Sequence, residues 1–147
     1  MEKLREGGML VAKIHQVGGR IFAKKLKEYD LNEINPAQGR ILFVLWENDG
    51  IPIHELSEKT LLKKSTLTSM LDRLEDMGYI IREPSKNDRR KIIIKRTEKD
   101  KAFQELYLQV SKEMTDLFYN GLTEEEIDQL EAWLRKILDN LTNADKE

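Results

Sequence analysis

The amino-acid sequence predicts a mainly α fold with a small β-hairpin, an α+β class in which helices dominate. Apolar residues recur every three or four positions along most of the 147 residues, which is the spacing of amphipathic helices. One pair of short, isoleucine-rich runs separated by turn residues has the pattern of a hairpin instead. Charged residues make up 35% of the chain and hydrophobic residues 39%, a balance typical of a folded, soluble protein.

Composition excludes several kinds of protein. The chain contains no cysteine, which excludes disulfides, cysteine-ligated zinc and thiol redox sensing. It has no apolar run of about 18 residues that could span a membrane. Its first residues lack the uninterrupted apolar core of a signal peptide. We therefore expect an intracellular, cytoplasmic protein that has no membrane partner.

Four helices are expected before the hairpin. The second has the clearest start, because the capping side chain of Asn35 is followed by Pro36 at the first helical position. The fourth ends at Gly78, and the first contains two glycine pairs that weaken its prediction. The predicted spans are residues 4–29, 36–46, 53–59 and 64–77.

The hairpin is predicted from strands at residues 79–83 and 91–95, with a turn at 84–90. Its second half reads SKNDRRKIII, in which polar turn residues run into three cations and then three isoleucines. This pattern suits a solvated hairpin tip, and it equally suits a surface that contacts a polyanion.

Two further helices follow the hairpin. One spans residues 98–119 with a stripe of Phe103, Leu106, Val110, Met114 and Leu117. The other begins with a capping box at Thr123–Glu126 and is apolar over more than half of its circumference. Together with the first helix they carry more apolar surface than a monomer of this size needs. We expect a homodimer built on these helices, with an intramolecular bundle as the alternative.

Charge is unevenly distributed along the chain. Residues 54–97 carry 11 basic and 7 acidic side chains, whereas residues 98–147 carry 6 basic and 13 acidic ones. The middle of the chain is therefore the part suited to meet a polyanion. A solvated surface of uneven charge is the other interpretation.

The order of elements from residue 36 to 97 predicts a winged helix-turn-helix: a helix, a short helix, a turn, a second helix and a hairpin. The helix at 64–77 supports this, because its apolar side chains fall on one face and its lysines and small hydroxylated side chains on the other. Short side chains at the N-terminal end allow close approach to a major groove, where hydroxyls bond base edges or phosphates. An ordinary amphipathic helix would also show two such faces.

Residues 61–100 resemble the core of the MarR family of winged-helix transcriptional regulators. The matching features are the run Leu71-Asp72-Arg73-Leu74-Glu75, Gly78, the wing motif Asp88-Arg89-Arg90, and Thr97. The residues that begin at Leu122-Thr-Glu-Glu-Glu are similar to the family's usual final helix, so the resemblance covers nearly the whole chain. Two positions depart from the family pattern: Arg96 precedes Thr97 where leucine is common, and Asp100 replaces a glycine.

The resemblance implies roles for particular residues. Asp88 would hold Arg90, which would insert into the minor groove of DNA, while Arg89 and Lys91 would contact phosphates. Lys63 and Arg73 are also placed to contact phosphate, and Gln38 would either do so or be exposed to solvent. The candidates for major-groove contacts are Lys64, Ser65, Thr66, Thr68 and Ser69.

The function implied by the resemblance is that of a homodimeric repressor on a pseudo-palindromic operator in double-stranded DNA. A small aromatic or phenolic effector would relieve repression; His15 would line its pocket, pack in the interior or face solvent. Residues 1–35 and 98–147 would dimerise, and residues 36–97 would bind DNA. No cofactor or metal is expected, and His54-Glu55 lacks the second histidine of a zinc protease, so no enzyme is expected. The alternative function is a helical protein-interaction module without sequence-specific DNA binding.

Overall fold

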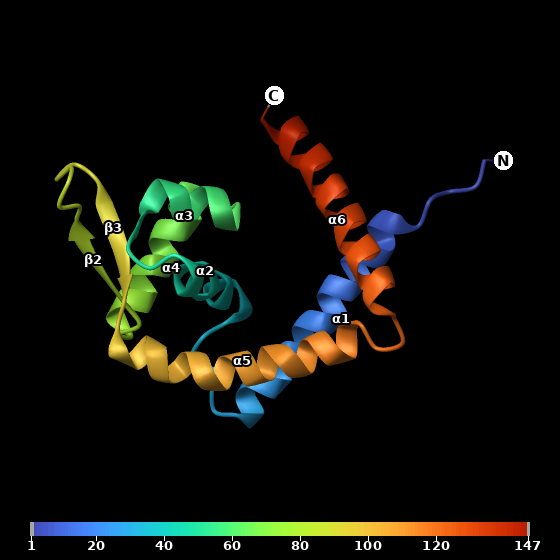
Figure 1. The fold of residues 1–147 in the computed structure, drawn as a ribbon, viewed down its shortest axis with the longest axis horizontal. Helices are drawn as coiled ribbons and strands as arrows, with labels where there is room; N and C mark the ends of the chain where they lie inside the picture. Colours follow the sequence, from blue (N-terminus) through green and yellow to red (C-terminus); the bar gives the residue numbers. More distant parts are fainter. Residues whose placement is uncertain (1, 147) are drawn as a thin grey trace. The chain divides into compact units, whose positions relative to one another are not determined.

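A computed structural model describes residues 2–146 of the chain (Figure 1). The chain divides into two compact units, the first ending at Val110 and the second beginning at Ser111. The elements in order are α1 Gly7–Glu28, α2 Pro36–Glu47, β1 Ile51–Pro52, α3 Ile53–Thr60, α4 Lys64–Asp76, β2 Ile80–Pro84, β3 Ile92–Arg96, α5 Glu98–Phe118 and α6 Glu124–Asp145. This architecture confirms the predicted fold class, a mainly helical winged helix-turn-helix.

The helix boundaries follow from the local sequence. Asn35 caps α2 as predicted, since its side chain accepts a hydrogen bond from the Gln38 backbone N–H at 2.8 Å. Thr123 caps α6 through the predicted capping box with Glu126. The α1 helix runs without interruption through both glycine pairs, and α4 ends at Asp76, two residues before Gly78 at φ +86°.

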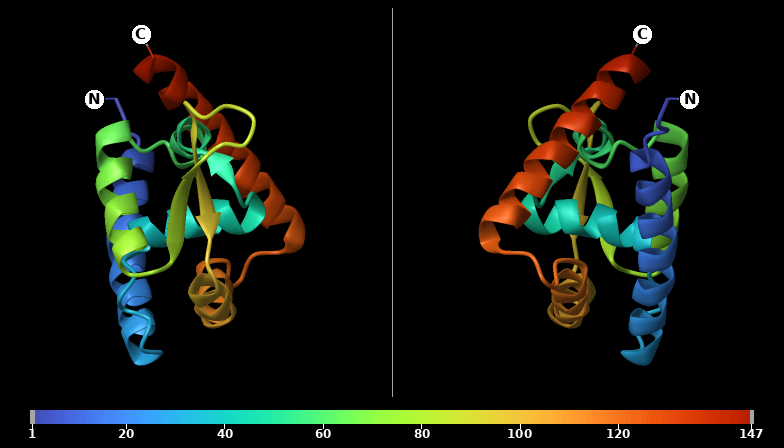
Figure 2. Two further views of the ribbon diagram at one scale, coloured as in Figure 1. Left: turned by 90° about the vertical axis from the view of Figure 1, so that its left-hand side faces the viewer. Right: turned by 90° about the vertical axis from the view of Figure 1, so that its right-hand side faces the viewer.

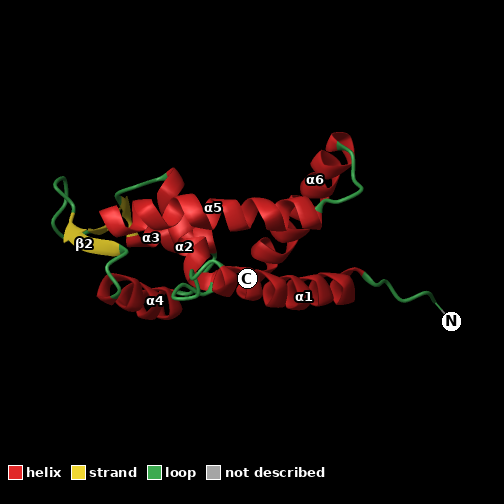
Figure 3. Ribbon diagram, turned by 90° about the horizontal axis from the view of Figure 1, so that it is seen from below, coloured by secondary structure: helices red, strands yellow, loops and turns green. Residues whose placement is uncertain are grey.

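The sheet has three antiparallel strands in the order β1-β3-β2. Strands β2 and β3 form the predicted hairpin, in which Ile80 pairs with Arg96 and Pro84 with Ile92. The two-residue strand β1 was not expected from the sequence, because a pair of residues is too short to show an alternating pattern; Ile51 pairs with Ile94. Figure 3 shows that strands are confined to this one region of a helical chain.

The core of the first unit lies between its helices and the hairpin, and Figure 2 shows α4 beside the hairpin. Leucines from α2, α3 and α4 meet the hairpin residues Ile80 and Ile94 there, and all of them are buried. The α5 helix adds Phe103 and Tyr107. Tyr107 lies so close to α2 that a side chain at Gly39 would collide with its hydroxyl. Burial raises the pKa of Tyr107 to about 12.

The second unit contributes almost nothing to a core. No residue of α6, which is described over its whole length, is buried, and its apolar stripe includes Ile137 at 51% and Leu141 at 64% exposure. Of the apolar stripe expected on α5, Phe103 and Val110 are buried, whereas Leu106 and Leu117 are exposed in one chain. Asp100 and Tyr107 also belong to the buried face of α5. A charged side chain in that face was not foreseen, because residue type alone favours exposure for aspartate.

Candidate nucleic-acid interface

The α4 helix presents the predicted hydroxylated face to solvent. Its apolar face is anchored by Leu67, Leu71 and Leu74, each fully buried. The exposed residues on the opposite face are Lys64, Ser65, Thr66, Ser69, Asp72 and Arg73, and Lys63 at the capping position is exposed as well. Thr68 differs from them, since it is half-buried and its hydroxyl donates to the backbone carbonyl of Lys64 at 2.8 Å. The Thr68 oxygen retains lone pairs, but its proton is used within the helix.

The N-terminus of α4 receives no side-chain cap from the described residues. Lys63 at the capping position is extended, with φ −65° and ψ 147°, and makes no capping hydrogen bond. The first backbone N–H groups of a helix have no partner within the helix and carry a partial positive charge. Flanked by Lys63 and Lys64, this end of α4 favours an anionic partner such as a phosphate.

Arg82 ties α4 to the hairpin, a role that the sequence did not reveal. Its guanidinium Nη2 donates to Asp72 at 2.7 Å and to Glu75 at 2.8 Å, and its backbone N–H also donates to Glu75 at 3.1 Å. The hydrogen bond from the Arg82 side chain lowers the pKa of Glu75 and raises that of Arg82. Two carboxylates of α4 are thereby paired with one guanidinium, which offsets one of their two negative charges.

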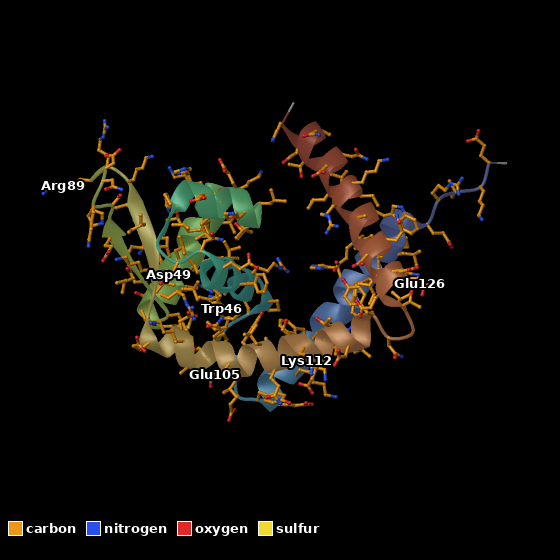
Figure 4. The ribbon with its side chains drawn as sticks, viewed as in Figure 1. Trp46, Asp49, Arg89, Glu105, Lys112 and Glu126 are labelled. Carbon is orange, nitrogen blue, oxygen red and sulfur yellow. The ribbon has the colours of Figure 1, made fainter. Side chains whose placement is uncertain are left out.

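The loop of the hairpin, residues 85–91, carries the other group of candidates. Asp88 accepts hydrogen bonds from the backbone N–H of Arg90 at 3.0 Å and from its Nε at 3.3 Å. The Arg90 side chain is nevertheless 92% exposed. Arg89 and Lys91 are exposed as well, and Figure 4 places Arg89 at the tip of the loop. We call residues 80–96 the wing from here on.

The wing loop is held in shape by its own backbone. The Ser85 N–H donates to the Lys91 carbonyl at 2.8 Å, and the Lys91 N–H donates to the Asp88 carbonyl at 2.9 Å. The Ser85 hydroxyl accepts from the Asn87 N–H at 3.2 Å. Because these bonds close the loop locally, the cationic side chains project from a defined turn.

The structure tests the expectations for two further residues, Gln38 and His15. Gln38 is buried, with 3% exposure, and its Oε1 accepts from the Asn35 N–H at 3.0 Å. The expectation that Gln38 faces solvent is therefore wrong, because its side chain completes the capping box of α2; a contact of Gln38 with phosphate stays a prediction. His15 lies exposed on α1, which excludes a packed interior position within one chain.

A hollow of about 400 Å³ lies beside the exposed face of α4, between it and the start of α2. Its lining joins Ser65, Ser69 and Arg73 of α4 to Asn35, so part of the hydroxylated face borders a concave surface. Among the described residues, no group of three histidine, cysteine, aspartate or glutamate side chains could hold a metal ion. None of the helices within residues 2–146 is long and apolar enough to cross a membrane.

Comparison with known proteins agrees with this geometry. The model of the MarR family matches residues 34–92. The chain is 30% identical over 128 residues to the transcriptional regulator SarZ of Staphylococcus aureus (strain MRSA252), covering 86% of this chain and 82% of SarZ. It is 28% identical over 131 residues to the transcriptional repressor IacR of Pseudomonas putida, covering 89% of this chain and 77% of IacR.

The fold is also similar to that of a solved structure. A mutant MarR from E. coli complexed with operator DNA superposes with a TM-score of 0.79 at 27% identity, covering 93% of this chain and 99% of that one. The fold and the exposed cationic elements define a winged helix-turn-helix regulator. The chain belongs to the MarR family of transcriptional regulators.

Proposed function

We propose that this protein is a homodimeric repressor that binds a pseudo-palindromic operator in double-stranded DNA. In this proposal α4 of each protomer enters a major groove, and the two helices read half-sites about 34 Å apart, one turn of the duplex. The wings reach the flanking minor grooves. The observation that carries the proposal is that one compact unit exposes both the uncapped, hydroxylated start of α4 and the arginine-bearing wing loop.

The residues divide by the kind of contact that they make. Ser65, Thr66 and Ser69 are short enough for base edges to approach, and Thr68 joins them as a hydrogen-bond acceptor and a methyl group. Lys63 and Arg73 neutralise phosphates, as do Arg89 and Lys91 on the wing, whereas Lys64 contacts the major groove together with the hydroxylated residues. These phosphate contacts supply most of the affinity and fix the register, whereas the base contacts supply discrimination.

Arg90 is the residue that enters the minor groove. Its side chain is 92% exposed, yet Asp88 restrains both its backbone and its Nε. A restrained and extended arginine loses less side-chain entropy on insertion than a free one does. A narrow, A·T-rich minor groove concentrates the negative potential that attracts it.

Dimerisation rests on the helices that flank residues 36–97. In one chain α1 exposes Met9 at 62% and Ile14 at 50%, and α6 exposes Trp133 at 58%. Contiguous exposed apolar side chains at helical spacing need a partner surface, and a second copy supplies an identical one. We assign dimerisation to residues 1–35 and 98–147, and sedimentation should show a dimer at micromolar concentration.

The remaining parts of the proposal follow from family membership. A small aromatic or phenolic effector relieves repression, with a coupling between effector and DNA of about 1–3 kcal/mol. We assign the protein to the cytoplasm and give it no enzymatic activity, in line with relatives that are named as transcriptional regulators.

The test measures binding to duplex DNA over a salt series, with a duplex selected from a random pool as the operator. A steep fall of log affinity with log salt is expected, because cations released from the phosphates drive binding. Arg90→Ala should weaken operator binding by about 1–3 kcal/mol while the dimer stays intact. Arg40→Ala, which removes an exposed arginine of α2 that has no assigned contact with DNA or with the second protomer, is the control and should have no effect. A flat salt series would instead support the protein-interaction module.

A further inference from the structure

A buried ion pair closes the base of the wing. Arg96, the last residue of β3, places its Nε 2.6 Å from Oδ2 of Asp100 in the first turn of α5. The Arg96 side chain is 12% exposed and that of Asp100 is fully buried. The exposed salt bridge between Lys101 and Glu98 lies in the same turn and differs from this pair in that solvent surrounds it.

Trp46 of α2 completes the site. Its indole N–H lies 3.0 and 3.1 Å from the two carboxylate oxygens of Asp100. The Arg96 Nη2 donates to Gln104, one turn further along α5. The charges of Arg96 and Asp100 are thus both hydrogen-bonded. The bonds join β3 and α5, which follow each other in the chain, to α2, whose Trp46 lies 54 positions before Asp100.

Further bonds fasten both strands of the wing at the same level. The Arg96 backbone N–H donates to Asp49 at 2.9 Å, and the Thr97 hydroxyl donates to the Gly78 carbonyl at 2.6 Å. Arg96 also pairs with Ile80, the first residue of β2. Figure 4 shows Trp46 and Asp49 at the base of the wing and Arg89 at its tip.

Burial of an ion pair is a poor route to stability. The cost of removing two charges from water offsets their attraction, and apolar side chains of similar size stabilise a core at least as well. What a hydrogen-bonded ion pair supplies is one defined arrangement of the elements that it joins.

A small rotation at the base of the wing produces a large displacement of its loop. Arg90 lies in the wing loop beyond the five residues of β3, which end at Arg96 and span about 16 Å of extended strand. A rotation of roughly 10° at the base would move the far end of β3 by about 3 Å, about half the width of a minor groove, which is about 6 Å. The angle of the wing at its base therefore decides whether Arg90 reaches the groove.

We infer that Asp100, Arg96 and Trp46 are positioning residues, which set the angle of the wing so that Arg90 meets the minor groove. This inference rests on the proposed function of Arg90. It predicts that loss of the buried contact weakens DNA binding through the wing, without contact between any of the three residues and DNA.

The experiment is a double-mutant cycle on the intact dimer, with the duplex selected by the wild-type protein as the probe. Asp100→Asn keeps the shape of the side chain and removes its charge, and Trp46→Phe keeps an aromatic ring and removes the N–H donor. Each variant should weaken binding by about 5- to 150-fold, the range of a lost arginine contact. Combined with Arg90→Ala, neither should weaken binding further, because the contact through which it acts is already gone.

Controls separate positioning from general loss of structure. Glu98→Gln removes a carboxylate from the same turn and should leave affinity unchanged. Thermal unfolding and sedimentation should show all variants folded and dimeric, and Trp46→Phe serves as the second route where Asp100→Asn proves unstable.

The possible outcomes are distinct. Weakening that adds fully to that of Arg90→Ala, or unchanged affinity in both Asp100→Asn and Trp46→Phe, would overturn the inference while the proposed function stands. An unchanged affinity for Arg90→Ala itself would overturn the wing assignment, and the inference with it.

Discussion

The helices α4 and α6 have similar amphipathic patterns, but within one chain the apolar face of α4 is buried and that of α6 is exposed. In α4 the apolar face is completed by the rest of the first unit, and Leu67, Leu71 and Leu74 are fully buried. In α6 the apolar face is left open, with Ile137 and Leu141 among its exposed side chains. Hydrophobic periodicity thus indicates which face of a helix must be covered without indicating what covers it.

The two helices also differ in the polar residues at their N-terminal ends. That of α4 has small hydroxylated residues and lysines at its start, whereas α6 begins with three consecutive glutamates. The start of α4 therefore favours a polyanion and the start of α6 disfavours one. Because the apolar face of α4 is buried within its own chain, the polar face of α4 is available for DNA. The apolar face of α6 is not buried within the chain and needs a second copy to cover it.

The largest effect is expected from a charge placed on the open face of α6. Ile137→Asp should dissociate the dimer, because a carboxylate in an apolar interface is costly to bury. Loss of the second half-site removes the gain from linked binding, so operator affinity should fall by about 10²- to 10⁴-fold. Sedimentation and operator titration measure the two effects. Asn143→Asp adds the same charge on the opposite face of α6 and should change neither; equal effects would remove α6 from the interface.

A smaller effect should distinguish burial within a chain from burial between chains. Leu71→Ala in α4 should lower the free energy of unfolding by about 2–5 kcal/mol, through lost burial and a cavity. Leu141→Ala makes the same exchange on the open face of α6, so its effect on thermal stability should depend on protein concentration. Melting curves over a hundredfold range of concentration test this. A cost for Leu71→Ala below 1 kcal/mol would contradict the packing seen around α4.

The smallest effect concerns the link between α4 and the wing. Because Arg82 lowers the pKa of Glu75 in the folded protein, this carboxylate stabilises the fold above its ordinary pKa of 4.5. That stabilisation is lost as the pH falls from 4.5 through the lowered folded value. Glu75→Gln should therefore make stability less dependent on pH in this acidic range, as measured by denaturant unfolding. Identical pH dependence in the variant and the wild type would show that the Arg82 contact is weak in solution.

Much of the fold could be predicted because its signals are local. The caps at Asn35 and Thr123 each lie within four residues of the groups that they satisfy, and both formed as expected. The buried and exposed faces of α4 followed from the three- and four-residue spacing of its leucines. By contrast, β1 is only two residues long and exists because Ile51 meets Ile94 across the sheet, a pairing between residues far apart in sequence.

The residue types of the candidate interface were predicted from the sequence, but the hydrogen bonds and ion pairs that hold its elements in place were not. Lysines and hydroxyls on α4 and the wing lie exposed where the pattern placed them, and their roles in binding stay predictions. Gln38 was misjudged because its partner is a backbone group that residue type does not disclose. Arg82 was missed because its link to Asp72 and Glu75 depends on how β2 lies against α4.

The sequence by itself determined the helices, their caps, the basic wing loop and membership of the MarR family, because these depend on residue type and short spacing. Only the tertiary structure decided that Asp100, read as a departure from a pattern, is buried against Arg96 and Trp46. Trp46 and Asp100 are 54 positions apart, and nothing in either local sequence indicates the other. Such contacts form only when folding excludes water and brings distant elements together, which makes the environment of a charge a property of the whole fold.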